Sequence, residues 1–255
     1  MKFATIVSGS SGNCIYIEGG STRVLVDAGL TLKTLKAACK EYGCEPADFA
    51  AILITHEHND HISGAERIWR RFGVPLWASV STWEHLPFSA CFSEKERHMF
   101  EYGMTIGELK FDFFRLSHDS VQPVGIIVEH EGLRLAIATD TGCVTPSMAK
   151  SLQDCDGYIL EANHDLDMLK KGPYRYALKR RVMSDHGPLS TAQAALALSQ
   201  LAGPHTKHGI WAHLSETNTT PELAMGQVMA VMQGAAFHPM ITVAPRHVPH
   251  KLVEL

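Results

Sequence analysis

Short apolar runs rich in β-branched residues recur through the first half of the chain, and they predict strands. Gly/Ser turns separate the first three runs, and the fourth leads directly into a group of histidines. Two other stretches carry apolar residues at helical spacing and end at a glycine, as helices commonly do. The expected strands are Lys2–Val7, Asn13–Glu18, Arg23–Asp27 and Ala51–Thr55, and the expected helices are Thr31–Tyr42 and Ser63–Phe72.

The second half of the chain alternates in the same way. The expected strands are Leu109–Leu116, Val124–Glu129, Leu133–Thr139, Gly157–Glu161, His208–Ala212 and Met240–Ala244, and the expected helices are Tyr174–Val182, Thr191–Leu201 and Pro221–Gln233. Alternating strands and helices favour an α/β fold in which helices cover mixed sheets. No linker or low-complexity tract divides the pattern, so we expect a single domain over residues 1–255.

The charge and composition of the chain argue against some classes of function. The chain has 255 residues and a net charge of −4, so any binding to nucleic acid must rest on a local basic patch. No run approaches 18 consecutive apolar residues, which argues against a membrane span. The N-terminal residues resemble a first strand rather than a signal peptide, and we therefore expect a cytoplasmic protein.

The stretch THEHNDH (55–61) concentrates metal-binding side chains: His56, His58, Asp60 and His61. Three more such residues also follow expected strands, namely His118, Asp140 and His213. Strand ends can meet at one edge of a sheet, where α/β folds commonly place their sites. A His-rich solvated loop is the alternative, but several buried imidazoles and acids without a metal would be costly.

In an extended segment, His56 and His58 point the same way and can bind one ion, while Asp60 and His61 lie past the turn and can address a second ion. Neither pair completes a coordination sphere, so further ligands must come from elsewhere in the chain. Imidazole suits Zn and Fe, and carboxylates tolerate Mn. We therefore expect two divalent cations, either Zn or Mn, with Fe as a third choice.

THEHNDH resembles the signature of the metallo-β-lactamase superfamily. Nearly the whole chain resembles one branch of it, the WalJ (YycJ) type. The segments that carry this resemblance are SGSSGN (8–13), VDAGL (26–30), ILITHEHNDHISG (52–64), SHDSVQPVG (117–125), ATDTG (138–142), LEANHD (160–165), LKRR (178–181) and AHLSETNTTPELA (212–224).

The resemblance implies a four-layer αββα sandwich with the site on one edge. It also implies three sets of ligands: His56, His58 and His118 for a first metal, Asp60, His61 and His213 for a second, and Asp140 as a bridge. A metal-bridging hydroxide would be the nucleophile, and Asp60 would help to orient it.

One segment departs from the branch. Where the family usually has Gly-His-Leu-Ser-Asn, this chain has GPLST (187–191), so Pro188 replaces a histidine that could donate a proton. His186 and His164 are the candidates to replace it. For His186, an exposed loop imidazole without a catalytic role is an equally good interpretation.

The segment KKGPYRYALKRR (170–181) has six basic residues and no acid. Lys179, Arg180 and Arg181 could neutralise phosphates, and Tyr174 could stack on an unpaired base. The alternative is a solvated helix face, in which Leu178 and Val182 would pack inward.

The resulting first hypothesis is a dinuclear metal-dependent phosphodiesterase that acts on DNA as an exonuclease. A second is a hydrolase of small esters, thioesters or cyclic phosphodiesters. A third, favoured by Pro188, is a nucleic-acid-binding or regulatory protein with impaired catalysis.

Overall fold

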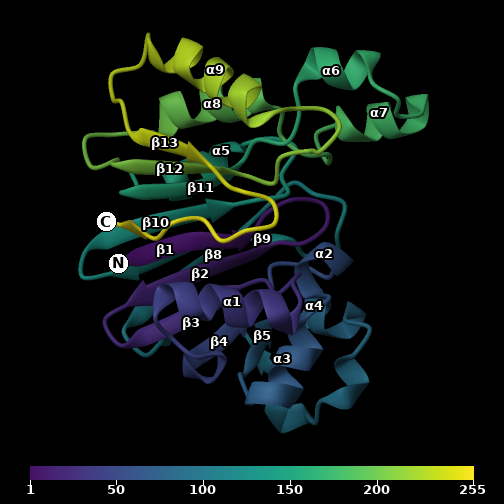
Figure 1. Ribbon diagram of the computed structural model, residues 1–255, viewed down its shortest axis with the longest axis vertical. Helices are drawn as coiled ribbons and strands as arrows, with labels where there is room; N and C mark the ends of the chain where they lie inside the picture. Colours follow the sequence, from purple (N-terminus) through teal and green to yellow (C-terminus); the bar gives the residue numbers. More distant parts are fainter.

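Two seven-stranded mixed sheets lie face to face in the computed structural model, which describes residues 1–255 (Figure 1). The strand orders are β14-β1-β2-β3-β4-β5-β6 and β13-β12-β11-β10-β9-β8-β7. The strands are β1 (Lys2–Val7), β2 (Cys14–Gly19), β3 (Thr22–Val26), β4 (Phe49–Leu53), β5 (Leu76–Ala78), β6 (His98–Met99), β7 (Gly103–Ile106), β8 (Leu109–Arg115), β9 (Val124–His130), β10 (Leu133–Ala138), β11 (Gly157–Glu161), β12 (His208–Ala212), β13 (Met240–Val243) and β14 (Val253–Glu254).

The two sheets share one design, in which an antiparallel part continues into a parallel part. In the first sheet, β14, β1, β2 and β3 pair antiparallel, and β3 to β6 pair parallel. In the second sheet, β7 to β10 pair antiparallel, and β10 to β13 pair parallel. The pairing of β1 with β14 places the two chain ends side by side (Figure 1).

Helices cover the outer faces of both sheets. Figure 1 shows α1, α3 and α4 below the first sheet, and α5, α8 and α9 above the second. The α-helices are α1 (Leu32–Tyr42), α2 (Asn59–Ile62), α3 (Ala65–Phe72), α4 (Val80–His85), α5 (Pro146–Leu152), α6 (Leu166–Lys171), α7 (Tyr176–Val182), α8 (Thr191–Leu201) and α9 (Pro221–Met232). Three short 3₁₀ turns are η1 (Pro46–Asp48), η2 (Ser89–Cys91) and η3 (Glu94–Glu96). The predicted αββα sandwich is confirmed.

Apolar side chains form three packed layers. The central layer joins the sheets, with Phe3 and Ile17 from the first facing Ile126 and Ile137 from the second. The outer layers pack α1, α3 and α4 on one side and α5, α8 and α9 on the other. Full burial of each such side chain contributes about 1.5–3 kcal/mol, and the sheets are therefore a firm base for residues at their ends.

Local signals set the helix ends. The Thr31 hydroxyl accepts a hydrogen bond from the Thr34 N–H at the start of α1, and Gly43 ends the helix with φ at 71°. Glycine adopts this left-handed conformation without the steric cost that most other residues would meet. No helix combines the length and the apolar character that a membrane crossing requires.

Candidate metal centre

Four strands bring metal-binding residues to one edge of the sandwich. His56 and His61 follow β4, His118 follows β8, Asp140 follows β10, and His213 follows β12. Asp140 and His213 have left-handed backbones, with φ at 59° and 58°. That conformation is costly for residues other than glycine and is often found at functional sites. The strained turns direct both side chains into the site rather than along the strands.

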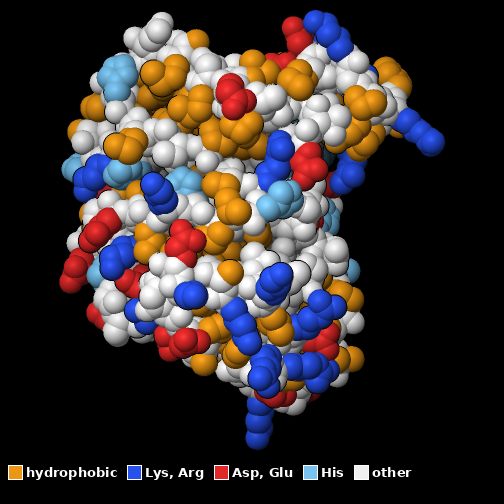
Figure 2. Space-filling model, in the orientation of Figure 1, with side chains coloured by type: hydrophobic (Ala, Val, Ile, Leu, Met, Phe, Trp, Pro, Cys, Tyr) orange, Lys and Arg blue, Asp and Glu red, His pale blue; other side chains and the backbone are white.

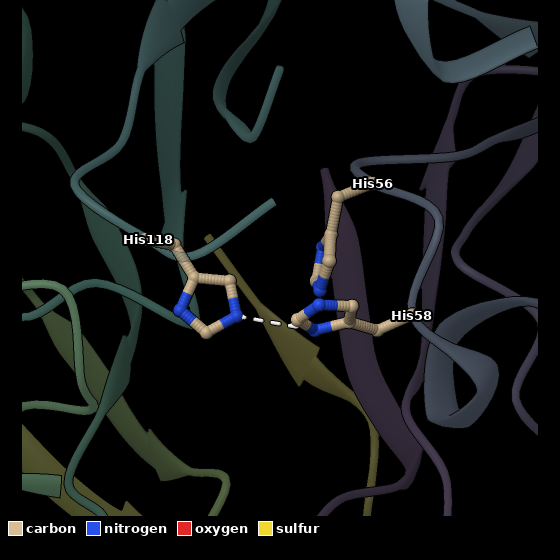
Figure 3. A group of neighbouring side chains, drawn as sticks. All are labelled: His56, His58 and His118. Carbon is tan, nitrogen blue, oxygen red and sulfur yellow. Dashed lines mark hydrogen bonds between the residues drawn. The ribbon is translucent and has the colours of Figure 1, made fainter. Parts of the chain in front are cut away.

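The first group of candidate ligands consists of His56, His58 and His118, which offer nitrogen atoms within 4.8 Å of one another. Figure 3 shows His56 and His58, on the loop after β4, facing His118, which lies on the loop after β8. The His58 Nδ1 lies 3.2 Å from the His118 Nε2. His56 Nε2 and His118 Nδ1 are buried without a hydrogen-bond partner. An unpaired buried nitrogen is costly, and a cation held between the three rings would satisfy His56 Nε2.

A second group contains Asp60, His61 and His213, again with atoms within 4.8 Å. The His213 Nε2 is buried without a hydrogen-bond partner and lies 3.7 Å from the Asp60 Oδ2. Asp140 stands between the two groups. Its Oδ2 is 2.9 Å from His61 Nε2, and its Oδ1 is 3.9 Å from His118 Nε2. These imidazole and carboxylate donors fit divalent Zn, Mn or Fe.

Two buried carboxylates that we did not single out from the sequence hold two of the candidate ligands in place. Asp27 Oδ2 lies 2.7 Å from His61 Nδ1, and Glu161 Oε1 lies 2.8 Å from His213 Nδ1. Both carboxylates are also tied to the backbone, since Asp27 accepts from the Thr55 N–H and Glu161 from the Thr141 N–H. Each contact leaves the Nε2 of its histidine facing the site, and carboxylate partners of this kind orient metal-binding imidazoles.

The electrostatics of the site favour cations. Burial opposes ionisation of Asp140, but His213 and His61 outweigh it and hold the pKa of Asp140 well below its usual range. Burial would lower the pKa of His61, yet Asp27 and Asp140 raise it to about 10. Burial raises the pKa of Glu161 to about 7, although His213 opposes the shift. The carboxylates thus draw positive charge to this edge, where a metal competes with protons for the same nitrogens.

A cleft of about 310 Å³ opens onto these ligands. Its second wall comes from the segment around α7, including Tyr174, Leu178, Arg181 and Val182. Figure 2 shows Lys and Arg side chains where α6 and α7 project from the body, above a hollowed part of the surface. No residue of α7 is buried, so the expectation that Leu178 and Val182 pack inward is wrong. Their apolar face lines the cleft instead.

The basic residues of this segment lie in different surroundings. Arg181 Nε donates to Asp119 Oδ2 at 2.6 Å, which ties α7 to the loop that carries His118. Lys179 donates to the Lys170 carbonyl, and Arg180 is exposed. Tyr174 and Arg181 line the cleft, whereas Lys179 and Arg180 are not part of its lining.

The two candidate proton donors also differ in their surroundings. His186 is exposed beside the cleft, with its Nδ1 at 3.4 Å from the Ser117 Oγ. Pro188, which replaces the expected histidine, lines the cleft itself. His164 is only 1% exposed and is absent from the cleft lining. Burial lowers the pKa of His164 to about 4, against the opposing effect of Asp165.

An αββα sandwich with a His/Asp cluster at one sheet edge defines a metal-dependent hydrolase of the metallo-β-lactamase type. The sequence model of the beta-lactamase superfamily domain matches residues 22–210. The metallo-β-lactamase fold protein YhfI from Bacillus subtilis superposes with a TM-score of 0.74 over 98% of both chains, at 16% identity, and so shares the fold.

Closer relatives come from the sequence comparison. The exodeoxyribonuclease WalJ of Streptococcus pneumoniae is 39% identical over 228 residues, which cover 88% of this chain and 85% of WalJ. The exodeoxyribonuclease YycJ of Bacillus anthracis is 35% identical over 242 residues, which cover 93% and 91% of the two chains. The chain belongs to the WalJ/YycJ family of the metallo-β-lactamase superfamily.

Proposed function

We propose that the protein is an exonuclease that hydrolyses phosphodiester bonds of DNA at a centre of two divalent metal ions. The observation that carries this proposal is the cleft itself. Its floor holds the His/Asp ligands, and its opposite wall presents Tyr174 and Arg181, which are suited to a base and a phosphate. The exodeoxyribonuclease names of the WalJ and YycJ relatives support the same substrate.

In this proposal, His56, His58 and His118 bind one ion, and Asp60, His61 and His213 bind the other. Asp140 is placed to contact both. Bound at these residues, two divalent ions would activate a water for attack on the phosphorus and would offset the negative charge on the phosphate oxygens. Zn and Mn both suit these donors.

The chain's own groups orient the reactants and move the proton. Asp60 is 23% exposed at its side chain and faces the cleft, where its carboxylate can accept a hydrogen bond from the attacking water. For protonation of the leaving oxygen, we favour His186 over His164. His186 is exposed and directly precedes Gly187 and Pro188, which line the cleft. In contrast, His164 is enclosed and, with a pKa of about 4, carries no second proton at neutral pH.

The α7 wall guides the substrate in this proposal. Arg181 is already paired with Asp119, so its guanidinium is held beside the metal ligands with donors left for a phosphate. Tyr174 offers a ring for stacking, and Lys179 and Arg180 add positive charge outside the cleft. This arrangement attracts the DNA backbone locally, although the chain as a whole is acidic.

The proposal is tested by digestion of end-labelled single-stranded and duplex DNA with Mn and, separately, with Zn. We expect successive shortening from one end. The small substrate bis-p-nitrophenyl phosphate serves as a control for the metal centre. Hydrolysis of that compound without any digestion of DNA would contradict the exonuclease proposal, and it would favour a hydrolase of small phosphodiesters.

A further inference from the structure

A second cavity, of about 470 Å³, borders the loop that carries His118. His118 and Asp119 line the catalytic cleft, whereas Val121 and Gln122 line this second cavity. Asp119 and Val121 are two residues apart, so their Cα atoms are separated by at most about 7 Å. The loop is also anchored to the metal-binding loop, because the Val121 N–H donates to Glu57 Oε1 at 3.0 Å. The loop from His118 to Gln122 is therefore a border that the two cavities share.

Aromatic rings form one side of the cavity. Tyr102 is 77% exposed, which is unusual for so large a side chain, and it lines the cavity with Phe113 and Phe114. Phe113 stacks on Phe100 with ring centroids 3.8 Å apart, and its N–H donates to the Tyr102 carbonyl. These contacts hold the Phe113 ring and the Tyr102 backbone in place, and they leave the Tyr102 ring exposed.

Unpaired polar groups complete the lining. The Arg115 side chain is exposed and makes no hydrogen bond or ion pair, in contrast to the Arg181 side chain, which is paired with Asp119. The Gln122 amide is likewise without a partner and can meet the polar edge of a ligand. Glu101 is the single acid in the lining. An aromatic platform with a free guanidinium suits a planar, anionic ligand.

We propose that this cavity, lined by Tyr102, Phe113, Arg115 and Gln122 and called here the aromatic subsite, binds an unpaired nucleotide of the DNA strand whose end lies at the metal centre. This inference rests on the proposed function. Tyr102 stacks on the base, and Arg115 contacts the adjoining phosphate. A base must be free of its complement to stack there, so the end of a duplex would have to open before its nucleotide could enter the subsite.

The test is a series of short oligothymidylates, each with one abasic position at a different distance from the digested end. With the wild-type protein, we expect kcat/KM to fall about tenfold at one position only, because one stacking contact is lost. Tyr102→Ala should lower kcat/KM on the intact oligonucleotide by a similar factor. On Tyr102→Ala, the abasic position should cause no further loss, since both changes remove the same contact.

Two further variants separate stacking from charge. Tyr102→Phe keeps the ring and should behave as the wild type. Arg115→Gln should raise KM and reduce the salt slope for the oligonucleotide by about 0.7, as expected for one lost phosphate contact on a single strand. The exposed Arg71 on α3 provides a matched control, so Arg71→Gln should leave the slope unchanged.

The outcomes distinguish this inference from the proposal on which it rests. The wild type could digest the oligonucleotide equally well whatever the abasic position, and Tyr102→Ala could leave kcat/KM unchanged. These two results together would overturn the subsite but not the proposed function. A wild type that hydrolyses bis-p-nitrophenyl phosphate but no oligonucleotide would overturn both the proposed function and the subsite. All variants should hydrolyse the small substrate at the wild-type rate, since none touches the ligands.

Discussion

The ligand edge of the sheets and the wall around α7 face each other across the cleft, yet they are held in different ways. His61, Asp140 and Glu161 are nearly fully buried, and each is fixed by other side chains or by the backbone. In contrast, α7 has no buried residue, and Arg181–Asp119 is its ion pair to the body. Segments with few buried contacts open at a lower free energy than packed ones.

This difference matches what each region must do in the proposed reaction. Metal ligands need fixed positions, because catalysis loses heavily when reacting groups are misplaced by about 1 Å. A surface that binds DNA of varied sequence benefits from being less tightly packed against the rest of the protein. Changes at the ligand edge should therefore affect the chemical step, and changes at the wall should affect substrate binding.

The largest effect is expected from Asp140→Ala. The substitution removes the carboxylate that lies near ligands of both groups, so hydrolysis of DNA and of bis-p-nitrophenyl phosphate should fall to background. Circular dichroism would show that the fold persists. Retention of substantial activity on either substrate would contradict a role for Asp140 at the centre.

Next in size is His186→Gln, which should lower kcat on DNA by about 10²–10⁴-fold if His186 protonates the leaving oxygen. The matched change His164→Gln should leave kcat close to wild type. Nitrophenolate is a good leaving group that needs little protonation, so bis-p-nitrophenyl phosphate should be much less affected by His186→Gln. Equal losses on both substrates, or a loss only in His164→Gln, would reverse the assignment.

Glu161→Gln addresses the support behind the ligand edge. Loss of the carboxylate beside His213 Nδ1 should weaken metal binding by about 10–100-fold, as for other partners of metal-bound histidines. Metal titration monitored by activity gives the affinity, and excess metal should restore most of kcat. If added metal does not restore activity, Glu161 has a role other than holding His213.

The smallest effect is expected at the wall. Reversal of Lys179 and Arg180 to Glu, combined with Arg181→Gln, should raise KM for DNA by about tenfold and flatten its salt dependence. The KM for bis-p-nitrophenyl phosphate should rise by less than the KM for DNA, because only Arg181 of the three side chains lines the cleft. Lys33→Glu, Lys40→Glu and Arg71→Gln on the outer helices α1 and α3 form the control. An unchanged salt slope in the α7 variant would remove this wall from substrate binding.

The strands and helices were predicted well from the sequence where neighbouring residues mark their ends. The bounds of β1, β11, β12 and α8 agree with their expected ranges, since alternation and capping residues mark them. The expected strand Ala51–Thr55 is β4, which ends two residues earlier at Leu53. Strands as short as β5 and β6, with three and two residues, lie below what periodicity can detect.

The ligand groups were easier to predict than their supports. The close spacing of His56 and His58 indicates a metal site from the sequence alone. In contrast, Asp27 and Glu161 are single carboxylates at strand ends, which carry no such signal. Their segments, VDAGL and LEANHD, were part of the family resemblance, but their role depends on contacts across 34 and 52 residues of sequence. Leu178 and Val182 show a further limit. Periodicity indicates an apolar helix face, but not whether the face meets a core or a cleft.

The most direct test of the two-metal centre is the metal content of protein purified without added metal, measured by plasma mass spectrometry. We expect about two ions per wild-type chain. His118→Ala and His213→Ala should each retain about one, because each removes a ligand from a different group. A wild-type content of one ion, or a complete loss of metal from either variant, would contradict two separable ions at this sheet edge.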